Sequence, residues 1–223
     1  MKKVAKSLVV SVLGWQVRRL RRKHDFRIIG IGGSMGKTST KFALAAVLKQ
    51  KFKIRYQQGN YNDIASVPLV FFGQNMPSLF NPLAWLVTFI KNEAVIRKVY
   101  PVDFVIVELG TDGPGQIAKF NQYLYLDIAI LTAIAPEHME FFEDLDAVAA
   151  EELSIAGLSK KLFFNADLCP AQYRQKIGGE HYAYGTITGV SYRLSGLKRD
   201  KHGFGFVVSK GNQSIIKTHH SSI

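Results

Sequence analysis

The stretch from Ile28 to Leu48 constrains the fold of this chain more than any other. It reads IIGIGGSMGKTSTKFALAAVL, which is a short apolar run, a glycine-rich turn and then a run of good helix formers. A glycine-rich turn between a strand and a helix directs backbone N–H groups at one point, and the helix N-terminus adds a partial positive charge there. The sequence therefore predicts an α/β fold with a phosphate-binding loop.

The glycine spacing of this turn is unusual. The common pattern, G-x-x-x-x-G-K-S/T, requires a glycine where this chain has Ile31. The glycines recur instead every three residues, at Gly30, Gly33 and Gly36. Phosphate binding is still expected with this spacing, because Lys37 can neutralise phosphate oxygens and Thr38 can offer a hydroxyl to Mg²⁺. We therefore expect nucleotide binding by Gly33, Ser34, Met35, Gly36, Lys37, Thr38 and Ser39.

From residue 26 onward, apolar runs alternate with helical patterns. The runs at 102–110 and 126–134 are continuous apolar strands of the kind that parallel sheets bury on both faces. The acid-rich segment 143–158 between two such strands predicts a helix. This order predicts a P-loop α/β sandwich with a mainly parallel sheet. Residues 181–223 are β-branched, aromatic and interrupted by glycines, which predicts antiparallel hairpins at the C-terminal end.

The first 25 residues form a basic leader ahead of this domain, which we place at 26–223. The chain has a net charge of +12, and residues 1–27 hold nine basic residues and one acid. If the leader is a helix, its apolar side chains cover most of the helix surface and leave a narrow polar stripe. Two arrangements remain open for the leader: a helix on an anionic membrane surface, or a helix packed on the domain.

Composition excludes several other classes. The apolar runs are shorter than the roughly 20 residues that span a bilayer, and RRLRRK follows the leader where a signal peptide would have a cleavage site. No aromatic-rich basic sheet or DNA-reading motif accompanies the charge, so we expect no nucleic-acid partner. The single cysteine, Cys169, excludes a disulfide framework and fits a cytoplasmic protein, peripheral to the inner face of the membrane if the leader binds there.

Glu108 is a candidate metal ligand on chemical grounds. It ends the apolar run VDFVIVE, and ligand sites of open α/β sheets collect at the carboxyl ends of strands. A carboxylate oxygen at that edge suits Mg²⁺. The alternative is a solvated carboxylate at a strand end.

Further motifs follow in a fixed order and suggest a family. They are GNYNDIASVPL, VIVELGTDGPGQI, AILTAIAPEHMEFFEDLDAVA, LFFNADL and the YG at 184–185. With the glycine turn, they run from about Arg27 to Val208 in the order found in the Mur ligase family. The chain resembles the central, ATP-binding domain of that family, and within it the branch that adds D-alanyl-D-alanine.

The resemblance implies an enzyme of peptidoglycan precursor synthesis for the cell wall, a ligase that uses ATP and Mg²⁺. Such ligases phosphorylate the carboxylate of a UDP-muramyl peptide, and the amine of an amino acid or dipeptide then displaces the phosphate. By resemblance, Lys37 binds the β- and γ-phosphates and acts in catalysis together with His138. Thr38 and Glu108 bind one Mg²⁺ and His138 a second, while Asn60 and Asn62, also typical of a plain turn, contact substrate or phosphate.

The chain departs from the family pattern at three places. Gly32 stands where the family has threonine, which keeps the loop permissive. The helix after His138 carries a metal-binding carbamylated lysine in the family, but residues 143–158 contain no lysine. Glu151 or Glu152 lies near that position, and we assign the metal role to Glu152.

The ends of the chain also differ from the family. The basic leader occupies the place of the N-terminal domain, and Ile223 precedes both the segment that completes the adenine pocket and the C-terminal domain. We therefore expect a truncated chain that binds nucleotide weakly and makes no peptide product by itself. Two alternatives to an active ligase are a non-catalytic nucleotide-binding module at the membrane surface and an inactive fragment of a longer ligase.

Overall fold

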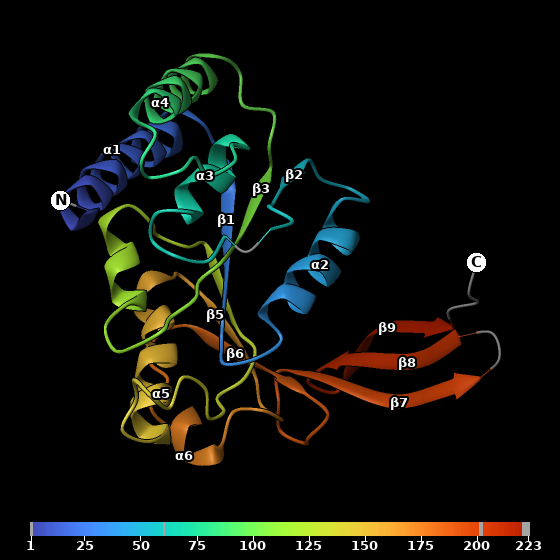
Figure 1. Cartoon of the computed structure of the whole chain (residues 1–223). Coiled ribbons are helices and arrows are strands. Elements are labelled where there is room, and N and C mark those ends of the chain that lie inside the picture. Colours follow the sequence, from blue (N-terminus) through green and yellow to red (C-terminus); the bar gives the residue numbers. More distant parts are fainter. Residues whose placement is uncertain (1, 60, 201–202, 220–223) are drawn as a thin grey trace.

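In the computed structural model, which describes residues 2–59, 61–200 and 203–219, the strands form one sheet (Figure 1). The strands are β1 (Arg27–Gly32), β2 (Ile54–Arg55), β3 (Phe104–Glu108), β4 (Ile128–Leu131), β5 (Leu162–Asn165), β6 (His181–Gly185), β7 (Tyr192–Asp200), β8 (Gly203–Lys210) and β9 (Gln213–His219). Their order in the sheet is β2-β3-β1-β4-β5-β6-β7-β8-β9. The strand before the glycine turn therefore lies inside the parallel part of the sheet, between β3 and β4.

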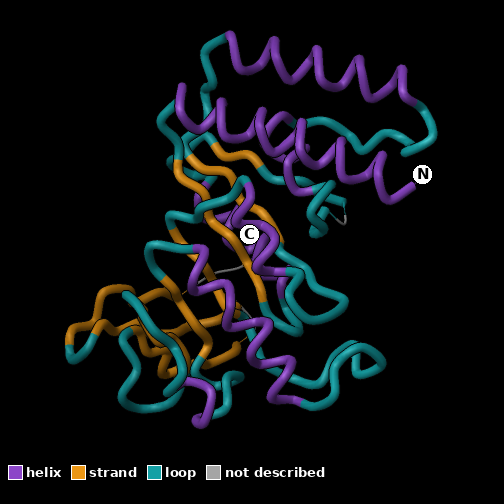
Figure 2. Tube along the Cα trace, turned by 90° about the vertical axis from the view of Figure 1, so that its left-hand side faces the viewer, coloured by secondary structure: helices purple, strands orange, loops and turns teal. Residues whose placement is uncertain are grey.

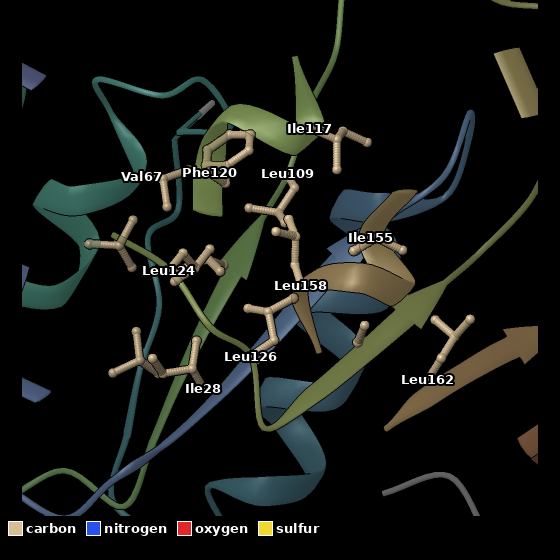
Figure 3. Close-up of a cluster of buried hydrophobic side chains, with 14 of the residues drawn as sticks. Ile28, Val67, Leu109, Ile117, Phe120, Leu124, Leu126, Ile155, Leu158 and Leu162 are labelled. Carbon is tan, nitrogen blue, oxygen red and sulfur yellow. The ribbon is translucent and has the colours of Figure 1, made fainter. Parts of the chain in front are cut away.

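Helices cover both faces of the parallel part, as expected for an α/β sandwich. They are α1 (Lys2–Lys23), α2 (Lys37–Leu48), α3 (Val67–Phe72), α4 (Pro82–Arg97), η1 (Ile117–Gln122), α5 (Leu145–Leu153), η2 (Ser154–Leu158) and α6 (Ala171–Arg174). On one face, α2 packs Ala45 against Ile31 and Ile106. On the other face, Val105 and Val107 join a larger cluster formed with α1, α3, η1 and η2 (Figure 3).

Gly30, in the middle of β1, lets the larger cluster close. A Cβ at this position would lie 2.4 Å from the Leu126 side chain, which is fully buried. Leu126 lies directly before β4, and Figure 3 shows it between Ile28 and Leu158. The glycine therefore brings the chain before β4 into van der Waals contact with β1.

The C-terminal hairpins are confirmed, but β6 is not part of them. β7, β8 and β9 pair antiparallel, as the sequence predicted. β6 pairs parallel with β5, from Leu162 and His181 to Asn165 and Tyr184, and parallel with β7. The reason is the short helix α6, which connects β5 to β6 as a crossover, and such a crossover returns the chain in the same direction.

Helix α1 packs on the domain. Leu13, Val17 and Leu20 are fully buried, and the amide of Gln16 donates to the Phe89 carbonyl of α4 at 3.0 Å. Both guanidinium–carboxylate distances between Arg19 and Glu93 are 2.7 Å. The apolar side that the leader would need for inserting into a membrane is therefore largely covered by the domain itself. Among the described helices, none has the length and apolar character to cross a membrane.

Asp127 joins α1 to the sheet. Its carboxylate accepts hydrogen bonds from Arg21 of α1 at 2.8 Å, from Lys160 at 2.8 Å and from the backbone N–H of Ile28 at 2.9 Å. A single carboxylate thus connects α1, the start of β1 and the start of β4. These bonds fix α1 in position over the sheet.

We expect Leu13→Ala to lower the free energy of unfolding by about 2–5 kcal/mol, because it removes a fully buried side chain and leaves a cavity. The matched control is Leu8→Ala on the same helix, where the side chain is 66% exposed and the change should stay within about 0.5 kcal/mol. Urea denaturation measures both. Equal, small effects would contradict the packing of α1 as part of the folding unit.

Candidate nucleotide and metal site

The turn between β1 and α2 is held by close packing against the end of β4. Gly33 has φ +120°, and a Cβ there would lie 2.3 Å from the hydroxyl of Thr132. That hydroxyl donates to backbone carbonyls of the turn, at 2.5 Å to Met35 and 3.0 Å to Gly32. Ser34 adds a backbone bond to the Ala133 carbonyl at 3.0 Å. Residues directly after β4 therefore shape the turn, and Gly33 must be a glycine for the two segments to approach.

The turn ends at Gly36, which adopts the left-handed conformation with φ 81° and precedes the first residue of α2. The first N–H groups of α2 consequently face the turn, and Met35 and Ser39 are exposed beside them. Lys37 folds back over the turn: its Nζ donates to the Gly33 carbonyl at 2.5 Å and lies 3.8 Å from Glu137. This arrangement presents backbone donors and one ammonium group to an anion.

Glu108 lies beside the turn because β1 and β3 pair in parallel register, with Ile31 opposite Glu108. The hydroxyl of Thr38 donates to Glu108 Oε2 at 3.0 Å. Lys41 Nζ lies 2.6 Å from Glu108 Oε1, and both side chains are about 95% buried. The structure thus brings Thr38 and Glu108 together, and it adds Lys41. Sequence reasoning missed Lys41, although its position one helical turn after Thr38 and Lys37 was a usable signal.

A second carboxylate approaches the turn from α5. Glu152 is fully buried, and its Oε2 accepts the backbone N–H of Gly33 at 2.6 Å. Its Oε1 and the Oε1 of Glu137 are buried without a hydrogen-bond partner among the described residues. Burial raises the pKa of the Glu152 carboxyl to about 8; the ammonium of Lys37 opposes this rise in pKa, and the carboxylate of Glu137 adds to it. Glu137 was missed in the sequence, although it precedes His138.

The neighbouring Glu151 has a different role. Its carboxylate accepts the backbone N–H of Gly115 at 2.6 Å and that of Ile117 at 2.7 Å. It therefore caps the N-terminus of η1. Of the two glutamates that the sequence offered, Glu152 is the one that contacts the phosphate loop.

The other predicted residues lie farther out. His138 is exposed, has φ 49° and places its ring 3.7 Å from Asp112 and 4.0 Å from Glu140. In the described residues, no ion pair or hydrogen bond links it to Lys37 or Glu108. The side chain of Asn62 packs against Gly110, which lies two residues after Glu108. The backbone carbonyl of Asn62 accepts the Gly110 N–H at 2.8 Å. Asn60 lies outside the described residues.

The oxygen atoms at the turn fit a Mg²⁺ ion that is shared with phosphates. In the part of the chain that the structure describes, no group of three or more His, Cys, Asp or Glu side chains could hold a metal by itself. Mg²⁺ usually takes only one or two protein carboxylates and completes its shell with water and substrate phosphates. Thr38 with Glu108, and the Oε1 atoms of Glu137 and Glu152, which accept no hydrogen bond from the described residues, supply that kind of incomplete ligand set.

The fold and this turn define a nucleotide-binding α/β domain of the P-loop type. The model of the Mur ligase middle domain matches residues 31–221, and the chain therefore belongs to this family. The fold class that the sequence predicted is confirmed by solved structures: a MurF ligase from Thermotoga maritima in complex with ADP gives a TM-score of 0.71 at 19% identity, covering 93% of this chain and 44% of that one.

Curated relatives agree with the family. The chain is 28% identical over 216 residues to the UDP-N-acetylmuramoyl-tripeptide--D-alanyl-D-alanine ligase of Borreliella burgdorferi, covering 94% of this chain and 41% of the relative. It is 24% identical over 193 residues to the enzyme of the same name from Bacillus subtilis, covering 82% and 35%. The chain thus spans about two fifths of the length of these relatives.

The raised pKa of Glu152 predicts a pH dependence of stability in protein free of divalent cations. Between its ordinary pKa of 4.5 and about 8, the folded protein holds a proton on Glu152 that the unfolded chain has lost. Stability should therefore fall as pH rises through this window, by about 1.4 kcal/mol per unit of pKa difference at most. Urea denaturation in EDTA, at about pH 5.5 and about pH 8.5, measures this loss.

Glu152→Gln should reduce the loss of stability between these pH values, because the amide does not ionise. Glu143→Gln is the matched control, since Glu143 lies just before α5 and is exposed. An unchanged loss in Glu152→Gln would show that Glu152 is not the group whose ionisation opposes folding.

Proposed function

We propose that this chain supplies the ATP-binding part of an ATP-dependent amide ligase of peptidoglycan precursor synthesis. The observation that carries the proposal is the set Lys37, Thr38 and Glu108 around a glycine turn, in a chain of the Mur ligase family. The named relatives are ligases that join D-alanyl-D-alanine to a UDP-N-acetylmuramoyl tripeptide.

The residues at the turn suit the first step of such a ligation. Backbone N–H groups at the start of α2 and the ammonium of Lys37 would bind the β- and γ-phosphates. Lys37 would exchange its bond to the Gly33 carbonyl for a phosphate oxygen, which is a stronger, charge-assisted partner. Thr38 and Glu108 would hold Mg²⁺, which supplies charge neutralisation at the phosphates when bound.

The reaction that we propose has two steps. A carboxylate oxygen of the UDP-muramyl peptide attacks the γ-phosphorus, the bond to the β–γ bridging oxygen breaks, and ADP leaves. The amine nitrogen then attacks the carbonyl carbon of the acyl phosphate, inorganic phosphate leaves, and the amine loses a proton. Lys37 stabilises the charge that develops on the phosphoryl oxygens in the first step.

The proposed substrates are a UDP-muramyl peptide, the carboxylate donor, and an amino acid or dipeptide amine. Residues near the carboxyl end of β3 would face them: Asn62 against Gly110, and His138 beside Asp112. We propose that Asn60 and Asn62 contact substrate or phosphate, and that His138 and Glu152 contribute to a second Mg²⁺ site. A cytoplasmic location follows from the use of ATP and a nucleotide-linked precursor.

Replacing Lys37 with alanine should abolish ATP binding, and Mg²⁺ should strengthen binding to the unaltered protein. Isothermal titration calorimetry with and without Mg²⁺ measures both effects. Lys49→Ala is the control, because Lys49 is an exposed lysine at the other end of α2. Unchanged affinity in Lys37→Ala would overturn the nucleotide site.

We expect this chain by itself to form no peptide product. Ligation requires the carboxylate, the γ-phosphate and the amine to be held at roughly 3–3.5 Å, a positioning effect of about 7–11 kcal/mol. The described residues supply the turn that we propose as the phosphate site, and the chain matches 41% of the Borreliella relative. The test is incubation with ATP, Mg²⁺, UDP-muramyl-tripeptide and D-alanyl-D-alanine, followed by mass spectrometry for the pentapeptide. Robust product would show that this chain positions all three reactants.

A further inference from the structure

Helix α4 is apolar on two opposite sides. One side, which includes Trp85 and Ile96, is buried against the domain and α1. The other side carries Leu83, Leu86, Val87 and Ile90, with exposed fractions of 68%, 53%, 43% and 60%. These residues follow the spacing i, i+3, i+4 and i+7, so they form one continuous stripe on the helix. An exposed stripe of this size needs an explanation, whereas isolated exposed apolar residues do not.

Helix α1 extends this stripe. Figures 1 and 2 show α1 and α4 side by side on the outside of the molecule. An apolar groove of about 560 Å³ runs between them, and its lining includes Val12, Trp15, Phe89, Ile90 and Ala94. Leu8 lies about two helical turns before Trp15, on the same side of α1, and it is exposed as well. We call this region the α1–α4 surface; it consists of Leu8, Val12, Trp15, Leu83, Leu86, Val87, Ile90 and Ala94.

The charge around the α1–α4 surface has one sign. The two helices contain ten basic residues and a single acid, Glu93. The guanidinium of Arg19 neutralises Glu93 at 2.7 Å and also stacks over the ring of Trp15 at 4.3 Å. Arg22, Lys91 and Arg97 are exposed on the two helices. An apolar stripe beside unneutralised cations is complementary to a surface that offers both hydrocarbon and negative charge.

From this combination, we propose that the α1–α4 surface binds an anionic phospholipid membrane, with both helices lying in the plane of the interface. The side chains of Leu83, Leu86 and Ile90 would enter the acyl boundary, and Trp15 would sit at the headgroup level. The cations of Arg22, Lys91 and Arg97 would contact lipid phosphates. A second copy of this chain is a poorer occupant, because pairing the same surface would bring two basic faces together.

This proposal differs from a leader that inserts its own apolar side. Leu13, Val17 and Leu20 are buried in the domain. Helix α1 therefore contributes its charge together with Leu8, Val12 and Trp15, and α4 contributes the stripe from Leu83 to Ile90. The geometry also leaves the phosphate turn accessible. In Figure 1, α1 and α4 lie at the top of the molecule, whereas the turn between β1 and α2 lies at the lower end of β1.

The test is co-sedimentation of the full chain with vesicles of phosphatidylcholine, with and without phosphatidylglycerol, over a range of salt concentrations. The first variant is Leu86→Glu/Ile90→Glu, which places two carboxylates in the stripe. The matched control is Val47→Glu on α2, because Val47 is 70% exposed and lies outside the α1–α4 surface. Circular dichroism and ATP calorimetry report whether each variant remains folded, independently of vesicle binding.

We expect the unaltered chain and Val47→Glu to bind vesicles that contain phosphatidylglycerol and to dissociate as salt rises. Leu86→Glu/Ile90→Glu should bind at least about tenfold more weakly, with unchanged ATP affinity. Equal binding of the unaltered chain to neutral and anionic vesicles would overturn the proposal. Binding of the double variant to anionic vesicles as strongly as the unaltered chain would overturn it too. Failure to bind vesicles, combined with self-association that the double variant abolishes in sedimentation equilibrium, would assign the surface to a second copy instead.

Discussion

The phosphate turn depends on the position of β1 between β3 and β4. The parallel register with β3 sets Glu108 opposite Ile31, directly beside the turn. On the other side, Thr132, the first residue after β4, contacts Gly33 so closely that only a glycine fits. Since carboxyl ends of parallel strands meet at one edge, three segments far apart in the sequence converge on one set of backbone donors. Without this strand order, the glycine turn would have no carboxylates near it.

Buried charge is the second consequence of this arrangement. Glu108 divides its two oxygens between Thr38 and Lys41, so its charge is compensated inside the fold. Glu152 has a backbone donor for only one oxygen. Its burial, and to a lesser extent the charge of Glu137, raise its pKa. Buried carboxyl oxygens without partners cost stability in the absence of a ligand. A bound cation would give these oxygens a partner, so cation binding would stabilise the folded protein.

Helices α1 and α4, on the outside of the sheet, combine a buried apolar side with an exposed one. α1 is bound to the domain by apolar packing, by Gln16 and by the ion pairs of Arg19 and Arg21. α4, which lies over α1, has a second apolar side that the described chain does not cover. The most basic part of the protein and the exposed apolar stripe of α4 therefore coincide on one face, and that face points away from the phosphate turn.

The sequence by itself determined the local elements and the class of fold. Periodicity and glycine spacing are properties of neighbouring residues, so they predicted the strands, the phosphate turn, α2 and the position of Glu108 at a strand end. They did not predict the parallel pairing of β6, the contacts of Lys41 and Glu137, or the hydrogen bond by which Glu152 reaches the turn. Those depend on contacts between residues that are distant in the sequence, from 19 positions for Leu162 and His181 to 119 positions for Gly33 and Glu152. Only the order of strands in the sheet brings such residues together, and that order decided the site.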